Sequence, residues 1–410
     1  MDIQTLYEAI DAMLPVTRST EQEDFKADLK NELQSYFNLI QALDVAAFNE
    51  PKDRDEIISQ IKVQIDTLET VVKYSFQGRH SEAYDLFQKQ MNGETGILNR
   101  ISYYKIDPSV KINIEDKEIG ERDTIFFRAR VFNDKRNQKS LDMFHIPFDQ
   151  RGKVTTQRYS VPGYPCLYLG TTVYACWEEM HRPHFDDLMI SGFKVIKGFT
   201  VYDLTVPTVD DYTPERLQKT LLRLPLIIAC QIRVKNENAQ FKPEYIIPQL
   251  LIETIICNNR RNLEQGKSKT DLPWGVIYSS THKSADFPYG RKFLENIALP
   301  VIESDKTTGH CDVLSSLFSI SAPLCFEYEA LKENASRPSW SSFSPKEYER
   351  YEQSRIGYME NKIRNSNMYQ EINHIYIENP YVHLTQDGKN SEKVFIKASK
   401  NIKYQIQEQD

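Results

Sequence analysis

The strongest constraint on this 410-residue sequence is a change of residue pattern near position 120. Before that point, apolar residues recur every three to four positions, which is the periodicity of amphipathic helices. After it, short runs of β-branched and aromatic residues alternate with turn-forming segments, which is typical of strands. Because a single hydrophobic core stops growing at ~250–300 residues, we predict several parts: a helical domain at 1–115, an α+β domain at 116–330 and a helix-plus-strand extension at 331–410.

Three helices are predicted in the first part. One covers residues 25–40, after a capping box formed by Thr20 and Glu23. The second covers 51–77, and the third starts with Ser81 as its N-cap. Together they indicate a small antiparallel helical domain.

Six strands are predicted in the second part, where they favour a mixed sheet. Two helices interrupt them. Thr213 and Pro214 open one as N-cap and first helical residue, and Pro248 must begin or kink the other. In the third part, Ser344 marks a helix start, and the run at 393–407 alternates like an edge strand. The six strand runs lie at 124–132, 165–172, 193–204, 275–280, 298–302 and 323–329.

Charge and composition limit the classes of partner. Acidic residues exceed basic ones by 58 to 51, which gives a net charge of −7 and argues against nucleic-acid binding as the main role. The N-terminus carries acids where a signal peptide needs a basic start, and no apolar run approaches the ~20 residues of a membrane span. We therefore expect a cytoplasmic protein without membrane contact.

The six cysteines form no C-x-x-C pair, which favours buried free thiols.

Four charged or hydroxyl residues stand beside turns and strand ends in the second part. Taken singly, an arginine in a strand, a glutamate on a helix or a serine in a strand is most often structural or solvated. Here they occur together and in order. The four segments are FRAR at 127–130, RYSVPGYPCLY at 158–168, ACWE at 175–178 and GVIYSS at 275–280.

These segments, in this order, resemble the RES domain family, which is named for its arginine, glutamate and serine. Gly163, Pro165, Leu167 and Tyr168 occupy the family's turn and strand positions. The resemblance covers about residues 120–330 and neither flank. Ser160 departs from the pattern, because many members have asparagine there.

The resemblance implies an α+β fold similar to ADP-ribosyltransferases, with NAD as the substrate. Family members are typically toxins of bacterial toxin–antitoxin pairs, which degrade NAD by hydrolysis or phosphorolysis, or transfer ADP-ribose to a protein. It also implies that Glu178 is the catalytic carboxylate, acting with Arg128 and Ser280. Motif alignment alone selects Glu178 over Glu179 and Ser280 over Ser279, and Glu179 is expected to face solvent. Water, phosphate or a protein target is the acceptor, and the sequence leaves the choice open.

The residue types suit that chemistry. Loss of neutral nicotinamide leaves an oxocarbenium-like ribose, which needs a carboxylate beside the sugar rather than an acid for the leaving group. Guanidinium groups are the best fixed partners for a pyrophosphate. Arg128 and Arg158 are assigned to it, Arg130 shares the strand face of Arg128, and Tyr159 or Tyr168 is predicted to stack on the nicotinamide ring. The full predicted substrate-binding set is Arg158, Tyr159, Tyr168, Ser160, Tyr278, Ser279 and Arg130.

No metal site is expected from the sequence. His181 and His184 flank Pro183, which breaks the helix that would place both rings on one face. His282 lies near Ser280, either lining the pocket or standing in a plain loop. The absence of G-x-G-x-x-G and Walker motifs agrees with an enzyme that consumes NAD.

Alternatives remain open at this stage. A non-catalytic module that holds ADP-ribose or another nucleotide would show the same residues. Residues 1–115 either gate the site or recruit a partner, such as an antitoxin, or they cover apolar surface or form a homodimer interface.

Overall fold

The structure, a computed structural model, describes most of the chain up to residue 372. The described residues are 1–18, 24–48, 51–92, 96–99, 103–114, 117–132, 139–184, 187–208, 214–267, 272–282, 291–302, 306–325, 354–366 and 369–372. The predicted C-terminal elements at Ser344 and 393–407 lie outside these ranges, as do the capping residues Thr20, Glu23 and Thr213.

The N-terminal part is a bundle of helices, as the periodicity predicts, but it has one helix, α1, more than the three predicted, and α4 begins at His80, before the predicted cap Ser81. Its helices are α1 (Ile3–Met13), α2 (Phe25–Gln41), α3 (Pro51–Phe76) and α4 (His80–Asn92), with short 3-10 turns at Val45–Ala47 and Ile97–Asn99. The side chain of Asp24 caps α2 by accepting a hydrogen bond from the backbone of Lys26 at 3.0 Å.

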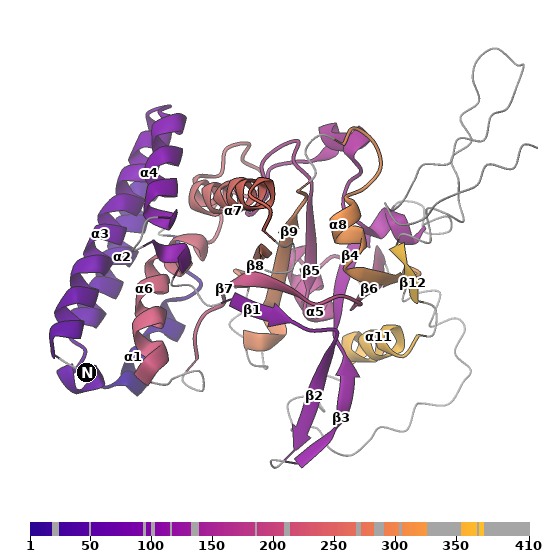
Figure 1. Ribbon diagram of the computed structural model, residues 1–410, viewed down its shortest axis with the longest axis horizontal. Coiled ribbons are helices and arrows are strands. Elements are labelled where there is room, and N and C mark those ends of the chain that lie inside the picture. Colours follow the sequence, from indigo (N-terminus) through magenta and orange to yellow (C-terminus); the bar gives the residue numbers. More distant parts are fainter. Residues whose placement is uncertain are drawn as a thin grey trace, which may run out of the picture.

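A ten-stranded mixed sheet forms the other half of the molecule (Figure 1). Its path runs β1-β7-β8-β9-β5-β4-β6-β10-β12, and β11 pairs with β6. Only the β7–β8 pair is parallel among these strand pairs. The strands are β1 (Tyr103–Ile106), β4 (Ile125–Val131), β5 (Cys166–Gly170), β6 (Leu188–Val195), β7 (Phe199–Leu204), β8 (Pro273–Ser279), β9 (Glu295–Pro300), β10 (Phe318–Ser321), β11 (Leu324–Cys325) and β12 (Tyr369–Glu371).

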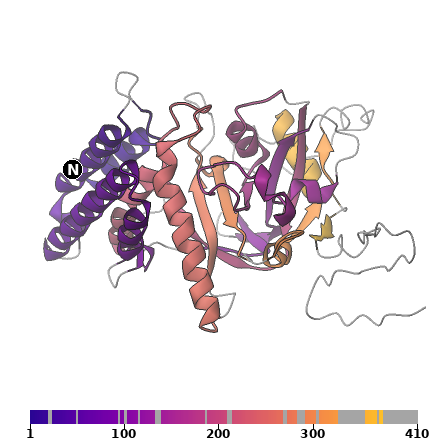
Figure 2. The same ribbon diagram turned by 90° about the horizontal axis from the view of Figure 1, so that it is seen from above.

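Two further helices join the bundle to the sheet. They are α6 (Pro214–Cys230) and α7 (Ile246–Glu264), and Figure 2 shows the helices gathered on one side of the sheet. Their apolar side chains belong to the same buried core as those of α1–α4. Tyr36 of α2, for example, is fully buried and donates a hydrogen bond to the carbonyl of Leu221 at 2.6 Å. Pro248 lies in the first turn of α7, where its missing N–H costs nothing.

Shorter helices cover other parts of the sheet. The helices α5 (Val173–Glu179) and α11 (Arg355–Arg364) share a small apolar core with β4 and β6, and α8 (Asp312–Ser315) packs beside β10. Position 275 of β8 permits no side chain, because a Cβ on Gly275 would lie 2.0 Å from the carbonyl oxygen of Ala298. The glycine of the GVIYSS motif is therefore needed because the backbones of β8 and β9 approach each other closely at this position.

Three strands depart from the predicted pattern. The region 103–123 forms β1 and a separate hairpin of β2 (Ser109–Ile114) and β3 (Lys117–Asp123), which projects at the bottom of Figure 1. β1 and β3 carry little apolar alternation, whereas β2 alternates Val110, Ile112 and Ile114 with polar residues and was missed although this signal was present. The predicted run at 193–204 divides at Gly198 into the ends of β6 and β7. No helix in the described ranges is long and apolar enough to cross a membrane.

Candidate functional site

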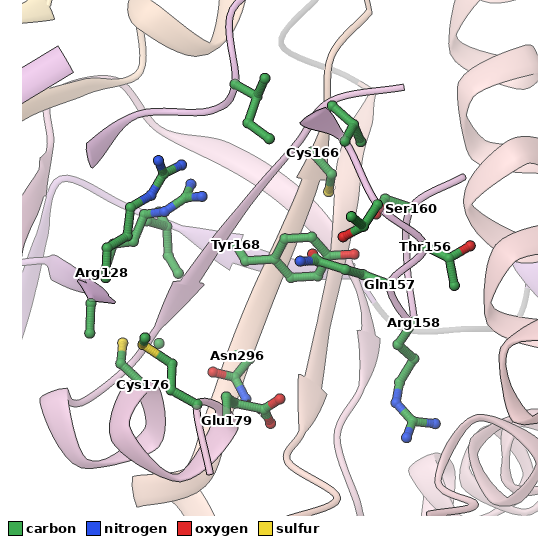
Figure 3. A pocket seen from close by; sticks show the side chains of 18 of the residues that line it. Arg128, Thr156, Gln157, Arg158, Ser160, Cys166, Tyr168, Cys176, Glu179 and Asn296 are labelled. Atoms are coloured by element: carbon green, nitrogen blue, oxygen red, sulfur yellow. Dashed lines mark hydrogen bonds between the residues drawn. The ribbon is translucent and has the colours of Figure 1, made fainter. Parts of the chain in front are cut away.

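A cavity of about 580 Å³ opens beside the central strands (Figure 3). Its walls come from β4, the segment 153–160, β5, the end of α5 and the segment 237–245, together with the ends of β8 and β9. Segments that are distant in the sequence thus meet at one place, and the four motif segments all contribute to it or to its immediate support.

Two arginines of β4 enter one end of the cavity. Arg128 and Arg130 both line it, as the two-residue period of a strand predicts. Arg130 donates a hydrogen bond to the carbonyl of Phe144 at 2.9 Å, whereas Nη1 of Arg128 is buried without a hydrogen-bond partner in the described residues. Burial lowers the pKa of the Arg128 guanidinium. A buried donor left without a partner is costly, so this end of the cavity suits an anionic ligand.

Arg158 has a different setting. Its Nη1 donates to the carbonyls of Cys230 and Ile232 at 2.9 and 3.0 Å, and its Nη2 donates to Oγ1 of Thr281 at 3.2 Å. Its guanidinium also lies 5.3 Å from the ring centroid of Tyr245. In Figure 3, Arg128 and Arg158 lie on either side of Tyr168. Arg158 therefore lines the cavity but ties its wall to the end of α6, which departs from the prediction of a free pyrophosphate clamp.

Glu179 places a carboxylate beside the central strands of the cavity. Its Oε1 accepts hydrogen bonds from Oγ of Ser280 at 2.5 Å and from Nδ2 of Asn296 at 2.9 Å. Its Oε2 lies 3.9 Å from Nε2 of His282. Ser280 itself is 1% exposed and stands behind Glu179. The side chains of Glu179 and Asn296 face each other in Figure 3.

Glu178, the predicted catalytic carboxylate, points elsewhere. It is 3% exposed and does not line the cavity. Arg182 donates to both of its oxygens, at 2.8 and 2.7 Å, and Tyr174 donates a third hydrogen bond. The structure therefore turns Glu179, and not Glu178, into the cavity, while the catalytic role of Glu178 stays a prediction. Tyr174 lies four positions before Glu178 on the same face of α5, which is the spacing of neighbouring helical side chains. Arg182 lies four positions after Glu178, beyond the end of α5 and with a φ of 54°.

The other predicted residues divide between the cavity and its support. Tyr168, Tyr278 and Ser160 line the cavity. Tyr159 does not: its ring is fully buried in the core, 4.5 Å from the ring of Tyr278, so it cannot stack on a bound base. Ser279 is also structural, because its Oγ accepts from the backbone of Val206 at 3.0 Å.

Two buried thiols also reach the cavity wall. Cys166 and Cys176 both line it, and burial raises the pKa of each thiol, that of Cys176 to about 12. Sγ of Cys176 donates to the carbonyl of Phe127 at 3.2 Å. Neither thiol has the lowered pKa of a nucleophile. They fit the sequence interpretation of buried free cysteines.

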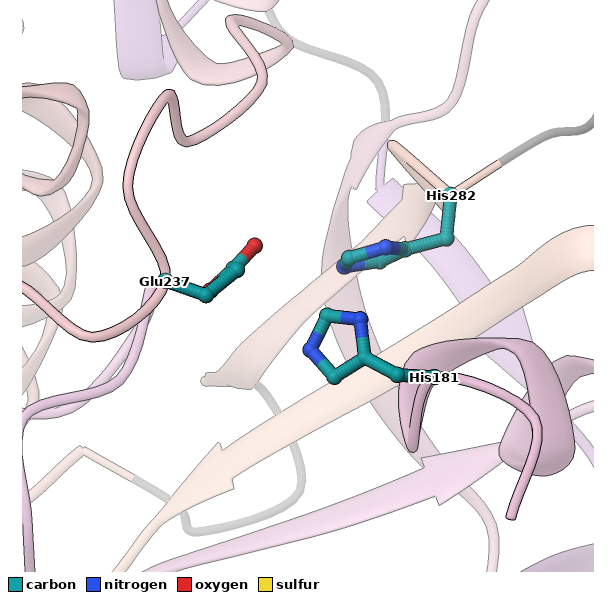
Figure 4. A group of neighbouring side chains, drawn as sticks. All are labelled: His181, Glu237 and His282. Atoms are coloured by element: carbon teal, nitrogen blue, oxygen red, sulfur yellow. The ribbon is translucent and has the colours of Figure 1, made fainter.

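Sequence reasoning missed several residues of the rim and floor. Asn296 lies near the start of β9, outside every recognised motif. His181, Glu237 and His282 meet at the rim although they come from three separate segments (Figure 4). His282 lines the cavity, which is one of the two placements considered for it from the sequence, whereas Glu237 was not considered. Only a fold can bring such residues together, and His184 is not among them.

These observations define the class of the molecule: an α+β protein with a mixed sheet. Its cavity offers, at one end, a guanidinium nitrogen that has no partner in the described ranges and, at another, a fixed carboxylate. The chain is 31% identical over 331 residues to the protein named Putative toxin YopC from Bacillus subtilis (strain 168), an alignment that covers 77% of this chain and 68% of that protein. It belongs to the same family. No protein-family model matches the sequence, and no solved structure matches it.

Proposed function

We propose that this chain is a RES-type enzyme with an ADP-ribosyltransferase-like fold that cleaves the nicotinamide–ribose bond of NAD. The observation that carries the proposal is the pairing, in one cavity, of the unpartnered Nη1 of Arg128 with the carboxylate of Glu179. NAD requires both a cationic and an anionic partner, because its pyrophosphate is anionic and its ribose becomes cationic as nicotinamide leaves.

Glu179 supplies the negative charge. As the C–N bond breaks, its electron pair leaves with neutral nicotinamide, and positive charge develops on the ribose. A carboxylate held by Ser280 and Asn296 does not have to reorganise when this charge appears. Water or phosphate then forms the new bond to the ribose carbon, and water gives up a proton in doing so.

The remaining residues bind and orient the substrate. Arg128 and Arg130 hold the pyrophosphate, and Tyr168, in the middle of Figure 3, offers its ring to nicotinamide. Arg158 keeps the wall segment in place through the carbonyls at the end of α6. Ser280 acts through Glu179 and is a positioning residue.

A role as a toxin follows from two independent supports. The family contains a protein named a putative toxin, and the motifs resemble a family of NAD-degrading toxins. An unrestrained enzyme of this kind would deplete the NAD of its own cell, so we expect an antitoxin or another regulatory protein as partner.

The test is incubation of the purified chain with NAD, with and without phosphate. Free nicotinamide with ADP-ribose indicates hydrolysis, and a phosphorylated ADP-ribose that appears only with phosphate indicates phosphorolysis. Transfer of label from adenylate-labelled NAD to a protein would identify an ADP-ribosyltransferase instead. NAD binding without release of nicotinamide would contradict the enzymatic proposal and leave a binding module.

A further inference from the structure

Three side chains that favour metal ions meet at the rim of the cavity. His181 follows the C-terminal end of α5, Glu237 lies in the segment between α6 and α7, and His282 follows β8. One ligand atom from each lies within 4.8 Å of the others. Figure 4 shows the two imidazole rings and the carboxylate turned toward a common point.

We propose that His181, Glu237 and His282 form a binding site for a divalent metal ion of the zinc type. Two imidazoles and one carboxylate are a ligand set that zinc accepts, with a fourth position left for water or another group. Zinc ligands lie ~2.0–2.2 Å from the ion, so the three atoms must move closer together than 4.8 Å. His181 and Glu237 are exposed, and their side chains are free to make this adjustment by small rotations.

The backbone supports the arrangement. His181 adopts a φ of 60°, a left-handed conformation that is uncommon for residues other than glycine. Its ring stands nearly perpendicular to that of His282, at 86° and with centroids 4.8 Å apart. The turn therefore directs His181 across to His282.

Two charged neighbours affect the site. Nζ of Lys242 lies 3.7 Å from Oε2 of Glu237, so the lysine competes for one oxygen of that carboxylate while the other remains for the ion. Oε2 of Glu179 lies 3.9 Å from Nε2 of His282 and can approach the fourth position. A bound ion would then draw negative charge away from the cavity.

This geometry predicts inhibition by the metal ion, a consequence that rests on the proposed NAD cleavage. An ion at the rim would narrow access to the cavity and neutralise Glu179, so nicotinamide release should fall as zinc is added and recover with a chelator. Metal binding itself does not depend on that proposal and is measured without NAD.

The experiment is calorimetric titration of the metal-free full-length chain with ZnCl₂ alone. One site per chain is expected. His181→Ala or Glu237→Gln should weaken zinc binding by about 100-fold. Loss of a residue that merely supports a metal ligand costs about 10- to 100-fold in affinity, so loss of a ligand should reach the upper end of that range. His184→Ala is the matched control and should leave the affinity unchanged. Circular dichroism of each variant verifies that it is folded.

The possible results distinguish failure of the metal site from failure of the proposed NAD cleavage. Absence of stoichiometric zinc binding, or an equal loss of affinity in His184→Ala and His181→Ala, would overturn the metal site whether or not NAD is cleaved. Zinc binding that requires His181 and Glu237, in a chain that releases no nicotinamide, would uphold the site and contradict the proposed function instead.

Discussion

Oγ of Ser280 donates a hydrogen bond to Oε1 of Glu179 over 2.5 Å, joining the end of β8 to the end of α5. Nδ2 of Asn296, on β9, donates to the same oxygen. The serine of the GVIYSS motif is therefore a direct partner of Glu179, which follows the motif glutamate Glu178 in the sequence. Two donors from the sheet fix the position of one carboxylate in the cavity.

Replacement of Ser280 tests this positioning. In Ser280→Ala, Glu179 loses one donor and its carboxylate becomes less ordered, so we expect kcat for NAD cleavage to fall about tenfold, or about 1.4 kcal/mol, with KM nearly unchanged. Steady-state kinetics measure the two constants separately. Ser279→Ala is the matched control, since Ser279 bonds to the backbone of Val206, and it should lower stability more than kcat.

Substitution of Arg128 should separate stability from binding. Its Nη1 is buried and has no hydrogen-bond partner among the residues that the structure describes, and such an unsatisfied donor costs ~1–3 kcal/mol. Arg128→Met should therefore raise the melting temperature of the ligand-free protein and abolish NAD binding. Thermal unfolding with and without NAD measures both effects.

Arg158→Lys provides the contrasting variant. It removes a guanidinium that donates to the carbonyls of Cys230 and Ile232, so the melting temperature should fall. If Arg128→Met were destabilising to the same degree and still bound NAD, the assignment of Arg128 to an anionic ligand would be wrong.

Much of the architecture could be predicted from the sequence because burial imposes periodicity. The faces of α2 and α3, and the strands β4, β5 and β8, carry apolar residues at the spacing of their element, and all were expected. By contrast, β1 exposes its first three residues, and its pairing with β7 depends on contacts distant in sequence. The spacing of apolar residues within β1 therefore does not identify it as a strand of the sheet.

The N-terminal helices should prove necessary for folding of the remainder. Their side chains share one buried core with α6 and α7, and Arg18 joins Asp28 and Glu244 through ion pairs of 2.7 and 2.6 Å. A chain that begins at Lys117 would expose this apolar surface, and we expect it to be insoluble or aggregated. Size-exclusion chromatography checks this. A soluble truncated protein with increased NAD cleavage would instead support a gating role for residues 1–115.

Acid should destabilise the fold through a buried histidine. Burial lowers the pKa of His310 to about 4 from an ordinary value of 6.5. Between these two values the unfolded chain binds a proton that the folded chain does not, so stability is lost as the pH falls from 6.5 to about 4, by ~3 kcal/mol in total. Urea unfolding at pH 7.5 and pH 4.5 should show a smaller decrease for His310→Gln than for the unmodified chain. An equal decrease would contradict the assignment.

The candidate site shows where sequence reasoning stops. Motif order located β4, the 158–168 segment, α5 and β8 at one cavity, but it could not decide which of two adjacent glutamates faces inward. That choice depends on the rotation of α5, which the pairing of Glu178 with Arg182 and the packing of Cys176 determine together. Asn296 and Glu237 had no pattern at all, because only the fold brings them to the site.

The most direct measurement compares nicotinamide release by Glu179→Gln and Glu178→Gln. Glutamine keeps the shape of either side chain, so Glu179→Gln should remove the charge beside the ribose and lower turnover by ~10²–10³. Glu178→Gln should keep near-normal turnover and lose some stability, because it weakens the ion pair with Arg182. Loss of turnover in Glu178→Gln with normal turnover in Glu179→Gln would contradict the account.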